Sequence, residues 1–132
     1  MTTFKSKVII KKTVQEVYGF LTDLNNHREL MPDNVQDWTS TADTASFNIQ
    51  NMTKLSLKVE NRVQDKEIKI VPSEKPPFKV ELNWQLSSID ANQTEALFVI
   101  SADLNMMMKI MASGPLQKLA DHQTHALAQI IG

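Results

Sequence analysis

The sequence predicts an α+β fold in which a curved antiparallel sheet of about seven strands wraps around a long C-terminal helix, with two short helices between the first two strands. Residues 35–104 place apolar side chains at every second position, which is typical of strands that bury one face. Residues 106–131 return to helical spacing. Short connections between consecutive strands favour antiparallel pairing.

The N-terminal part of the chain is predicted to form one strand and two short helices. Residues 3–12 alternate loosely, as in a strand. Thr13-Val-Gln-Glu16 has the spacing of a capping box, so we expect a helix of about three turns up to residue 24. Asn26-His-Arg-Glu29 repeats this pattern and predicts the start of a second helix. Pro32 ends that helix, because the residue before a proline is pushed away from helical angles.

The middle of the chain is predicted to form six further strands. The alternation is clearest at residues 55–63 and 78–86, where apolar side chains alternate with mainly Lys, Glu, Asn and Gln. Shorter candidates lie at residues 35–40, 45–50, 66–72 and 94–104.

The C-terminal helix is predicted to begin at a cap formed by Asp103 or Asn105. Pro115 removes one backbone hydrogen bond inside the helix, so we expect a kink or a separated first segment. One stripe runs along the helix and contains Ala112, Leu116, Leu119, Gln123, Leu127 and Ile130. The helix and a curved sheet can bury both of their apolar faces by packing together.

The composition excludes several classes of function. The 132 residues fit one domain that spans residues 1–132. A net charge of −1 argues against a nucleic-acid binder that works by bulk positive charge. The absence of Cys excludes disulfide scaffolds, thiol nucleophiles and Cys-ligated metals. The N-terminus is polar and the longest apolar run, residues 96–100, is too short to span a membrane, so we expect a cytoplasmic protein.

The order of elements resembles the START/SRPBCC superfamily, whose helix-grip fold is shared with plant pollen-allergen-like proteins and polyketide cyclases. The chain looks like a small bacterial stand-alone member, and the resemblance covers nearly all of it. The stretches that carry the resemblance are residues 14–24, Leu30-Met-Pro32 with Val35 and Trp38, and Leu104-Asn105 leading into Met106–Met111 and Gly114-Pro115-Leu116.

The resemblance implies a cavity between the sheet and the long helix that holds an apolar small molecule or lipid. Two departures argue against transfer of large lipids. The chain has three Gly residues and lacks the glycine-rich loop of the pollen-allergen branch. It is also shorter than a full lipid-transfer START domain.

Two polar residues interrupt apolar faces and are predicted to orient a ligand. Asn61 lies in phase with the apolar positions of its strand, and Gln123 lies on the stripe of the last helix. A buried polar group without a partner costs roughly 1–3 kcal/mol, so something should satisfy each of them. Internal hydrogen bonds, or an error in the assumed strand register, are the alternatives.

The other predicted ligand contacts are apolar. Aromatic strand residues are candidates for the cavity wall, and flexible Met side chains suit an adaptable lip. Ordinary core packing is the alternative for each. The complete predicted set is Asn61, Trp84, Phe98, Met107, Met111, Leu119 and Gln123.

Titratable residues give no site of their own. His122 and His125 lie three apart, but no third ligand has supporting spacing, so we predict no metal and no cofactor. His27 would need an oriented partner to act as an acid or base, and none can be named, so no catalytic residue is predicted.

Three functions remain open. The first is binding of an apolar small molecule or lipid, and the second is a polyketide cyclase/dehydratase-like enzyme. The third is a protein-interaction module, chaperone-regulating or toxin-like, with a filled core. A homodimer is also possible, because Leu97, Val99 and Ile9 form an outward apolar patch unless the inside and outside of their strand are reversed.

Overall fold

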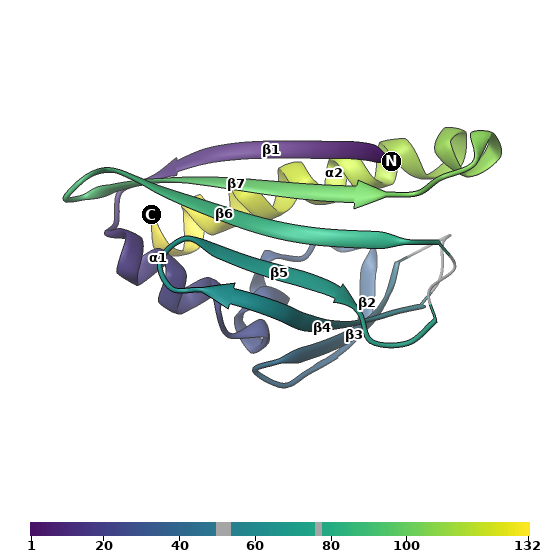
Figure 1. Ribbon diagram of the computed structural model, residues 1–132, viewed down its shortest axis with the longest axis horizontal. Coiled ribbons are helices and arrows are strands. Elements are labelled where there is room, and N and C mark those ends of the chain that lie inside the picture. The colour runs from purple at the N-terminus through teal and green to yellow at the C-terminus, as the bar shows by residue number, and fades with distance from the viewer. Residues whose placement is uncertain (50–53, 76–77) are drawn as a thin grey trace.

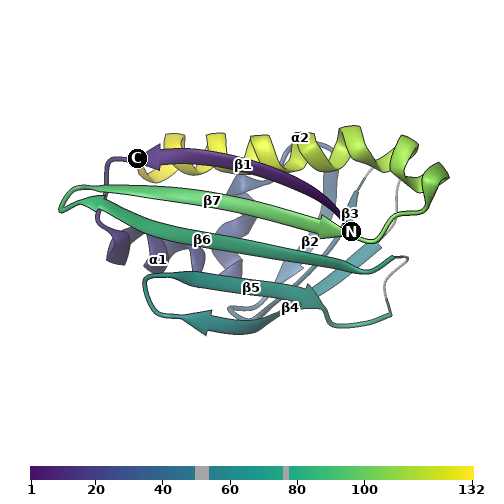
Figure 2. The same cartoon turned by 45° about the horizontal axis from the view of Figure 1, so that its top comes forward.

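A computed structural model describes residues 1–49, 54–75 and 78–132 and confirms the α+β helix-grip architecture. Seven antiparallel strands form one curled sheet in the order β1-β7-β6-β5-β4-β3-β2, and helix α2 lies along its inner side (Figures 1 and 2). Residue 50, the last of a predicted strand, lies outside the described residues. The elements are β1 (Thr2–Ile10), α1 (Val14–Leu21), the 3-10 helix η1 (Leu24–Leu30), β2 (Val35–Ser40), β3 (Thr44–Ile49), β4 (Lys54–Val63), β5 (Glu67–Pro72), β6 (Val80–Asp90), β7 (Gln93–Ala102) and α2 (Met106–Ile131).

Strands β6 and β7 follow directly from the alternating pattern. Every second residue of β7 is buried, and the inward positions of β6 continue the same apolar surface. Trp84 and Phe98 lie opposite each other in the register of these strands. Their rings stack with centroids 4.4 Å apart, at the middle of the core.

The two edges of the sheet are built differently. Edge strand β1 is tied to α2, because Gln117 Nε2 donates to Lys5 O at 3.1 Å and the Ser6 and Thr124 hydroxyls are 2.6 Å apart. Edge strand β2 is irregular, because its register with β3 shifts between Gln36 and Thr39. Asp37 lies in this shift with a left-handed φ of 56°.

The short helices begin and end at identifiable caps. The Thr13 hydroxyl accepts from Glu16 N at 3.2 Å, which confirms the predicted start of α1. Two details of the prediction are wrong. Helix α1 stops after two turns at Leu21, and η1 is capped by Asp23, whose carboxylate accepts from Asn25 N at 3.0 Å, and not by Asn26. The early cap at Asp23 leaves no room for a third turn of α1.

Helix α2 begins where predicted and is continuous. Asn105 Oδ1 accepts from Met108 N at 2.8 Å. Of the two alternatives expected at Pro115, a separated first segment is excluded, since helical structure runs through this residue. A proline inside a helix removes one backbone bond, and burial of the stripe offsets that loss, although Ile130 at its end is exposed. No helix among the described residues, α2 included, is long and apolar enough to cross a membrane.

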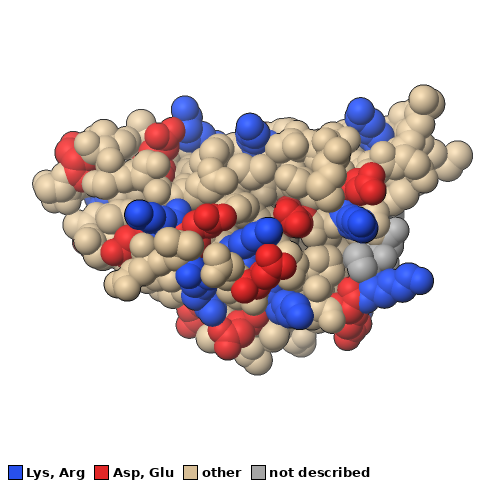
Figure 3. Space-filling view, viewed as in Figure 1, with Lys and Arg blue, Asp and Glu red and all other residues tan. Residues whose placement is uncertain are grey.

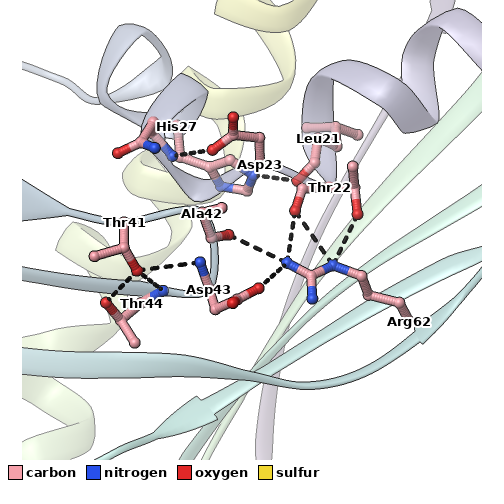
Figure 4. Close-up of polar contacts among 10 residues, drawn as sticks. Leu21, Thr22, Asp23, His27, Thr41, Ala42, Asp43, Thr44 and Arg62 are labelled. Carbon is pink, nitrogen blue, oxygen red and sulfur yellow. Dashed lines mark hydrogen bonds and ion pairs between the residues drawn. The ribbon is translucent and has the colours of Figure 1, made fainter.

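Arg62 joins three segments next to α1 (Figure 4). Its Nε donates to Thr22 Oγ1 at 2.8 Å, and its Nη2 donates to Thr22 O at 2.8 Å and to Ala42 O at 3.1 Å. The same Nη2 lies 2.8 Å from an Asp43 carboxylate oxygen. Strand β4 is thereby fastened to the end of α1 and to the turn between β2 and β3.

Replacing this arginine should cost stability. We expect Arg62→Ala to lower the free energy of unfolding by about 1–2 kcal/mol, because the bonds to charged guanidinium are lost at a site where the side chain is only 31% exposed. Arg62→Lys should recover only part of the loss, since an ammonium group cannot reproduce the forked N–H donors of a guanidinium group. Urea denaturation measures both.

The matched control is Arg28→Ala, which removes an exposed arginine from η1. It should change stability by less than about 0.5 kcal/mol. Equal losses for the two alanine variants would show that the Arg62 contacts do not fasten these segments.

Candidate functional site

A pocket lies between the inner face of the sheet and α2. Its cavity volume is about 30 Å³, which is room for roughly two water molecules. Known small-molecule sites are about ten times larger or more. The lining residues are Leu24, His27, Met31, Trp38, Ala45, Phe47, Leu55, Leu57, Ile70, Phe78, Val80, Leu82, Trp84, Phe98, Ile100, Leu116, Leu119 and Gln123.

Two stacked aromatic pairs form much of the wall. Trp84 and Phe98 stack on β6 and β7, and Trp38 and Phe47 stack with centroids 5.2 Å apart on β2 and β3. The pairs come from opposite parts of the curled sheet, so the pocket has aromatic surface on two sides. Large apolar side chains of this kind favour an apolar molecule.

The indole N–H of Trp84 has no hydrogen-bond partner in the part of the chain that the structure describes. Trp84 is fully buried, and its Nε1 is one of the few buried side-chain polar atoms among the described residues without a hydrogen bond. An indole can only donate, so an acceptor has to come from elsewhere. Trp84 also lines the pocket, so one residue of the wall carries an unused donor.

Gln123 supplies a second polar group, from the opposite wall. The residue is buried on α2, and its Nε2 donates to the Met31 sulfur at 3.8 Å. Thioether sulfur is a weak acceptor. Gln123 therefore holds Met31 weakly and can exchange this contact for a stronger one.

His27 is the third polar group and is uncharged at neutral pH. Its Nε2 lies 2.7 Å from Leu21 O (Figure 4). A carbonyl can only accept, so Nε2 carries the proton and Nδ1 is the acceptor. Burial lowers the pKa of His27 to about 4, against the opposing effects of the Leu21 hydrogen bond and the Asp23 charge.

Four predicted ligand residues line this pocket together: Trp84, Phe98, Leu119 and Gln123. The other three lie outside it. Met107 and Met111 are 72% and 67% exposed, because the first turns of α2 project beyond the sheet (Figure 1). The prediction that they form the lip of the pocket is wrong. Met108 is the methionine of this turn that packs against the core.

Asn61 is exposed, so its predicted place on the inner face is wrong. The register of β4 with β5 shifts between Val59 and Asn61, which is a β-bulge. Beyond it, Asn61 lies opposite the outward Lys69, and Arg62 lies opposite the buried Ile68. One inserted residue thus exchanges the faces of Asn61 and Arg62.

Sequence reasoning missed the wall supplied by η1. Leu24, His27 and Leu30 are all buried and are spaced by three. Residues i and i+3 share one face of a 3-10 helix, so this spacing indicated that His27 faces inward. The pocket offers His27 alone as a potential metal ligand within the described residues.

The predicted apolar patch faces outward, as in the first of the two alternatives given for it. Leu97 and Val99 lie half-buried on the outer face, so the inside and outside of β7 are not reversed. Ile9 is 58% exposed on β1. Whether this patch forms a homodimer stays a prediction.

Solved structures match this chain in fold, whereas no protein-family model and no curated protein sequence matches it. XoxI from Bacillus cereus is 11% identical, with a TM-score of 0.79 over 99% of this chain and 96% of its own. A START superfamily protein from Mycobacterium smegmatis is 12% identical, with a TM-score of 0.70 over 98% and 95%. The Zhui aromatase/cyclase from Streptomyces sp. R1128 is 9% identical, with a TM-score of 0.77 over 97% and 92%. At such identities the likeness establishes the fold, so this chain has a START/SRPBCC-type helix-grip fold.

Proposed function

We propose that this protein binds an apolar small molecule or lipid chain between the sheet and α2. The observation that carries the proposal is the mostly apolar pocket whose lining residue Trp84 has an unused donor. Ordinary cores leave few polar groups unpaired, whereas ligand pockets combine apolar walls with a few polar groups that orient the ligand.

A ligand must move side chains to enter, because the cavity volume is about 30 Å³. Met31 is the side chain that can move at least cost. It is only partly buried, it follows the end of η1, and its contact with Gln123 is weak. An unbranched thioether also repacks readily. Displacing Met31 would enlarge the pocket between η1 and α2.

A polyketide cyclase/dehydratase-like activity has weaker support. Among the described lining residues, His27 is the only titratable side chain. Its pKa of about 4 makes its free Nδ1 a poor base at neutral pH, and its one N–H, on Nε2, already donates to Leu21 O and cannot serve as the acid. The pocket therefore favours binding over acid–base catalysis.

A second candidate function is self-association through the projecting end of α2. Met106, Met107, Ile110 and Met111 are all at least two-thirds exposed, and Lys109 is the one charge among residues 105–117. Figure 3 shows acidic and basic side chains interspersed over the sheet, but mostly uncharged surface at this end. Two copies could bury these apolar side chains against each other without opposing charges.

Binding can be measured with the uncharged dye N-phenyl-1-naphthylamine. We expect its fluorescence to rise with the wild-type protein, because the dye enters the apolar pocket. Leu119→Trp should weaken binding at least tenfold by filling the pocket. Met107→Trp adds the same group outside the pocket and should bind the dye as the wild type does. Similar affinities for all three proteins would place the dye elsewhere.

His27 should make stability depend on pH. Unfolded His27 takes up a proton near pH 6.5, whereas folded His27 does so near pH 4. Between these values the unfolded chain binds more protons, so stability falls as the pH drops from 6.5 to 4, by about 3 kcal/mol in total. Urea unfolding at several pH values measures the slope.

The slope of the free energy of unfolding against pH, measured between pH 6.5 and 5, distinguishes the effect of His27 from that of other titratable groups. His27→Gln keeps a nitrogen donor for Leu21 O and should flatten this slope, whereas His125→Gln removes an exposed histidine and should leave it unchanged. An equal slope in His27→Gln and the wild type would mean that His27 is not buried as a neutral group.

Self-association predicts a concentration-dependent sedimentation coefficient. Ile110→Glu should abolish that dependence, because a carboxylate would be buried in the contact. Leu97→Glu, on the outer face of β7, tests the alternative patch. A monomer at all concentrations would remove this second candidate.

A further inference from the structure

We infer that the ligand of this pocket is an uncharged molecule with a ketone-, ester- or ether-type oxygen that accepts a hydrogen bond from Trp84 Nε1. The inference rests on the proposed function, since it names the chemical class that the same pocket takes.

The donor is fixed in place and has no acceptor among the described residues. Trp84 is fully buried, and its ring stacks on Phe98 with an interplanar angle of 21°. Its other cross-strand neighbour, Ile68 on β5, is apolar. The indole thus cannot satisfy its N–H through its neighbours in the sheet, and leaving a buried donor unmade is unfavourable.

Trp38 shows what an ordinary wall indole does in this chain. It also lines the pocket, but its Nε1 donates to Ser40 Oγ at 3.0 Å, and that hydroxyl donates to Asn25 Oδ1 at 2.7 Å. One indole is therefore built into a complete hydrogen-bond chain and the other is not. The difference marks Trp84 as the donor available to a ligand.

Ionised ligands do not suit this pocket, because its described lining residues carry no charge. No Lys, Arg, Asp or Glu lines the pocket within the described chain, and His27 is neutral. A buried ion needs a partner of opposite charge, so a carboxylate or an amine would be bound poorly. Gln123, on the facing wall, can meet a second uncharged polar group, because its amide both donates and accepts.

A pair of probes of similar shape isolates the acceptor. We would use 2-acetylnaphthalene, a ketone, and 2-ethylnaphthalene, a hydrocarbon, with 2-naphthoate as the charged analogue. Trp84→Phe keeps an aromatic ring and removes the N–H. We expect this substitution to weaken binding of the ketone relative to the hydrocarbon by about two- to tenfold, the range for one neutral hydrogen bond. Comparing the two probes cancels their different hydration and any change in pocket shape.

Nuclear magnetic resonance gives a second measurement on the unmodified chain. The protein has two Trp residues and so two indole N–H signals, which Trp38→Phe assigns. The ketone should move the Trp84 signal downfield, and the hydrocarbon should not. The Trp38 signal is an internal control, since its N–H is already bonded to Ser40.

The outcomes separate this inference from the proposed function. If both uncharged probes bind but the Trp84 signal responds equally to them and the ratio of affinities is unchanged in Trp84→Phe, the acceptor is not recognised and the inference is wrong. Tighter binding of 2-naphthoate than of the ketone would also overturn it. If neither uncharged probe binds, the proposed function fails, and the inference falls with it.

Discussion

Helix α2 and the inner face of the sheet bury their apolar surfaces against each other, and most of the molecule depends on that contact. The stripe on α2 supplies Leu116 and Leu119, and strands β6 and β7 supply Trp84 and Phe98. Burial of this surface is the main favourable term in folding. The pocket lies inside this contact, so the groups that stabilise the fold are also the groups that would meet a ligand.

The end of α1 links the pocket to the surface of the protein. A helix leaves its last carbonyls without partners, and here each partner comes from a different place. Phe20 O accepts from Asn26 Nδ2, Leu21 O accepts from His27 inside, and Thr22 O accepts from Arg62 outside. Three consecutive carbonyls therefore connect the end of α1 to η1, to the pocket wall and to strand β4.

Local patterns in the sequence predicted the elements well and the faces of some residues poorly. The alternation in β6 and β7 identified Trp84 and Phe98, and helical spacing identified Leu119 and Gln123. Asn61 was misplaced because a bulge depends on pairing with β5, which is not visible in the order of residues along β4. The positions of Met107 and Met111 were predicted wrongly because the first turns of α2 project beyond the sheet. How far one packed element extends past another is a tertiary property. The single domain remains an expectation from length alone.

The contrast between the two edge strands has a consequence for solubility at high concentration. A free, regular edge offers a row of N–H and C=O groups on which another chain can add a strand, and so begins aggregation. The Lys5 carbonyl of β1 is occupied by Gln117 of α2, and the left-handed residue Asp37 interrupts the ladder of β2. One acceptor of the β1 edge is thus already used and the β2 edge is irregular, and both features hinder growth of the sheet by strand addition.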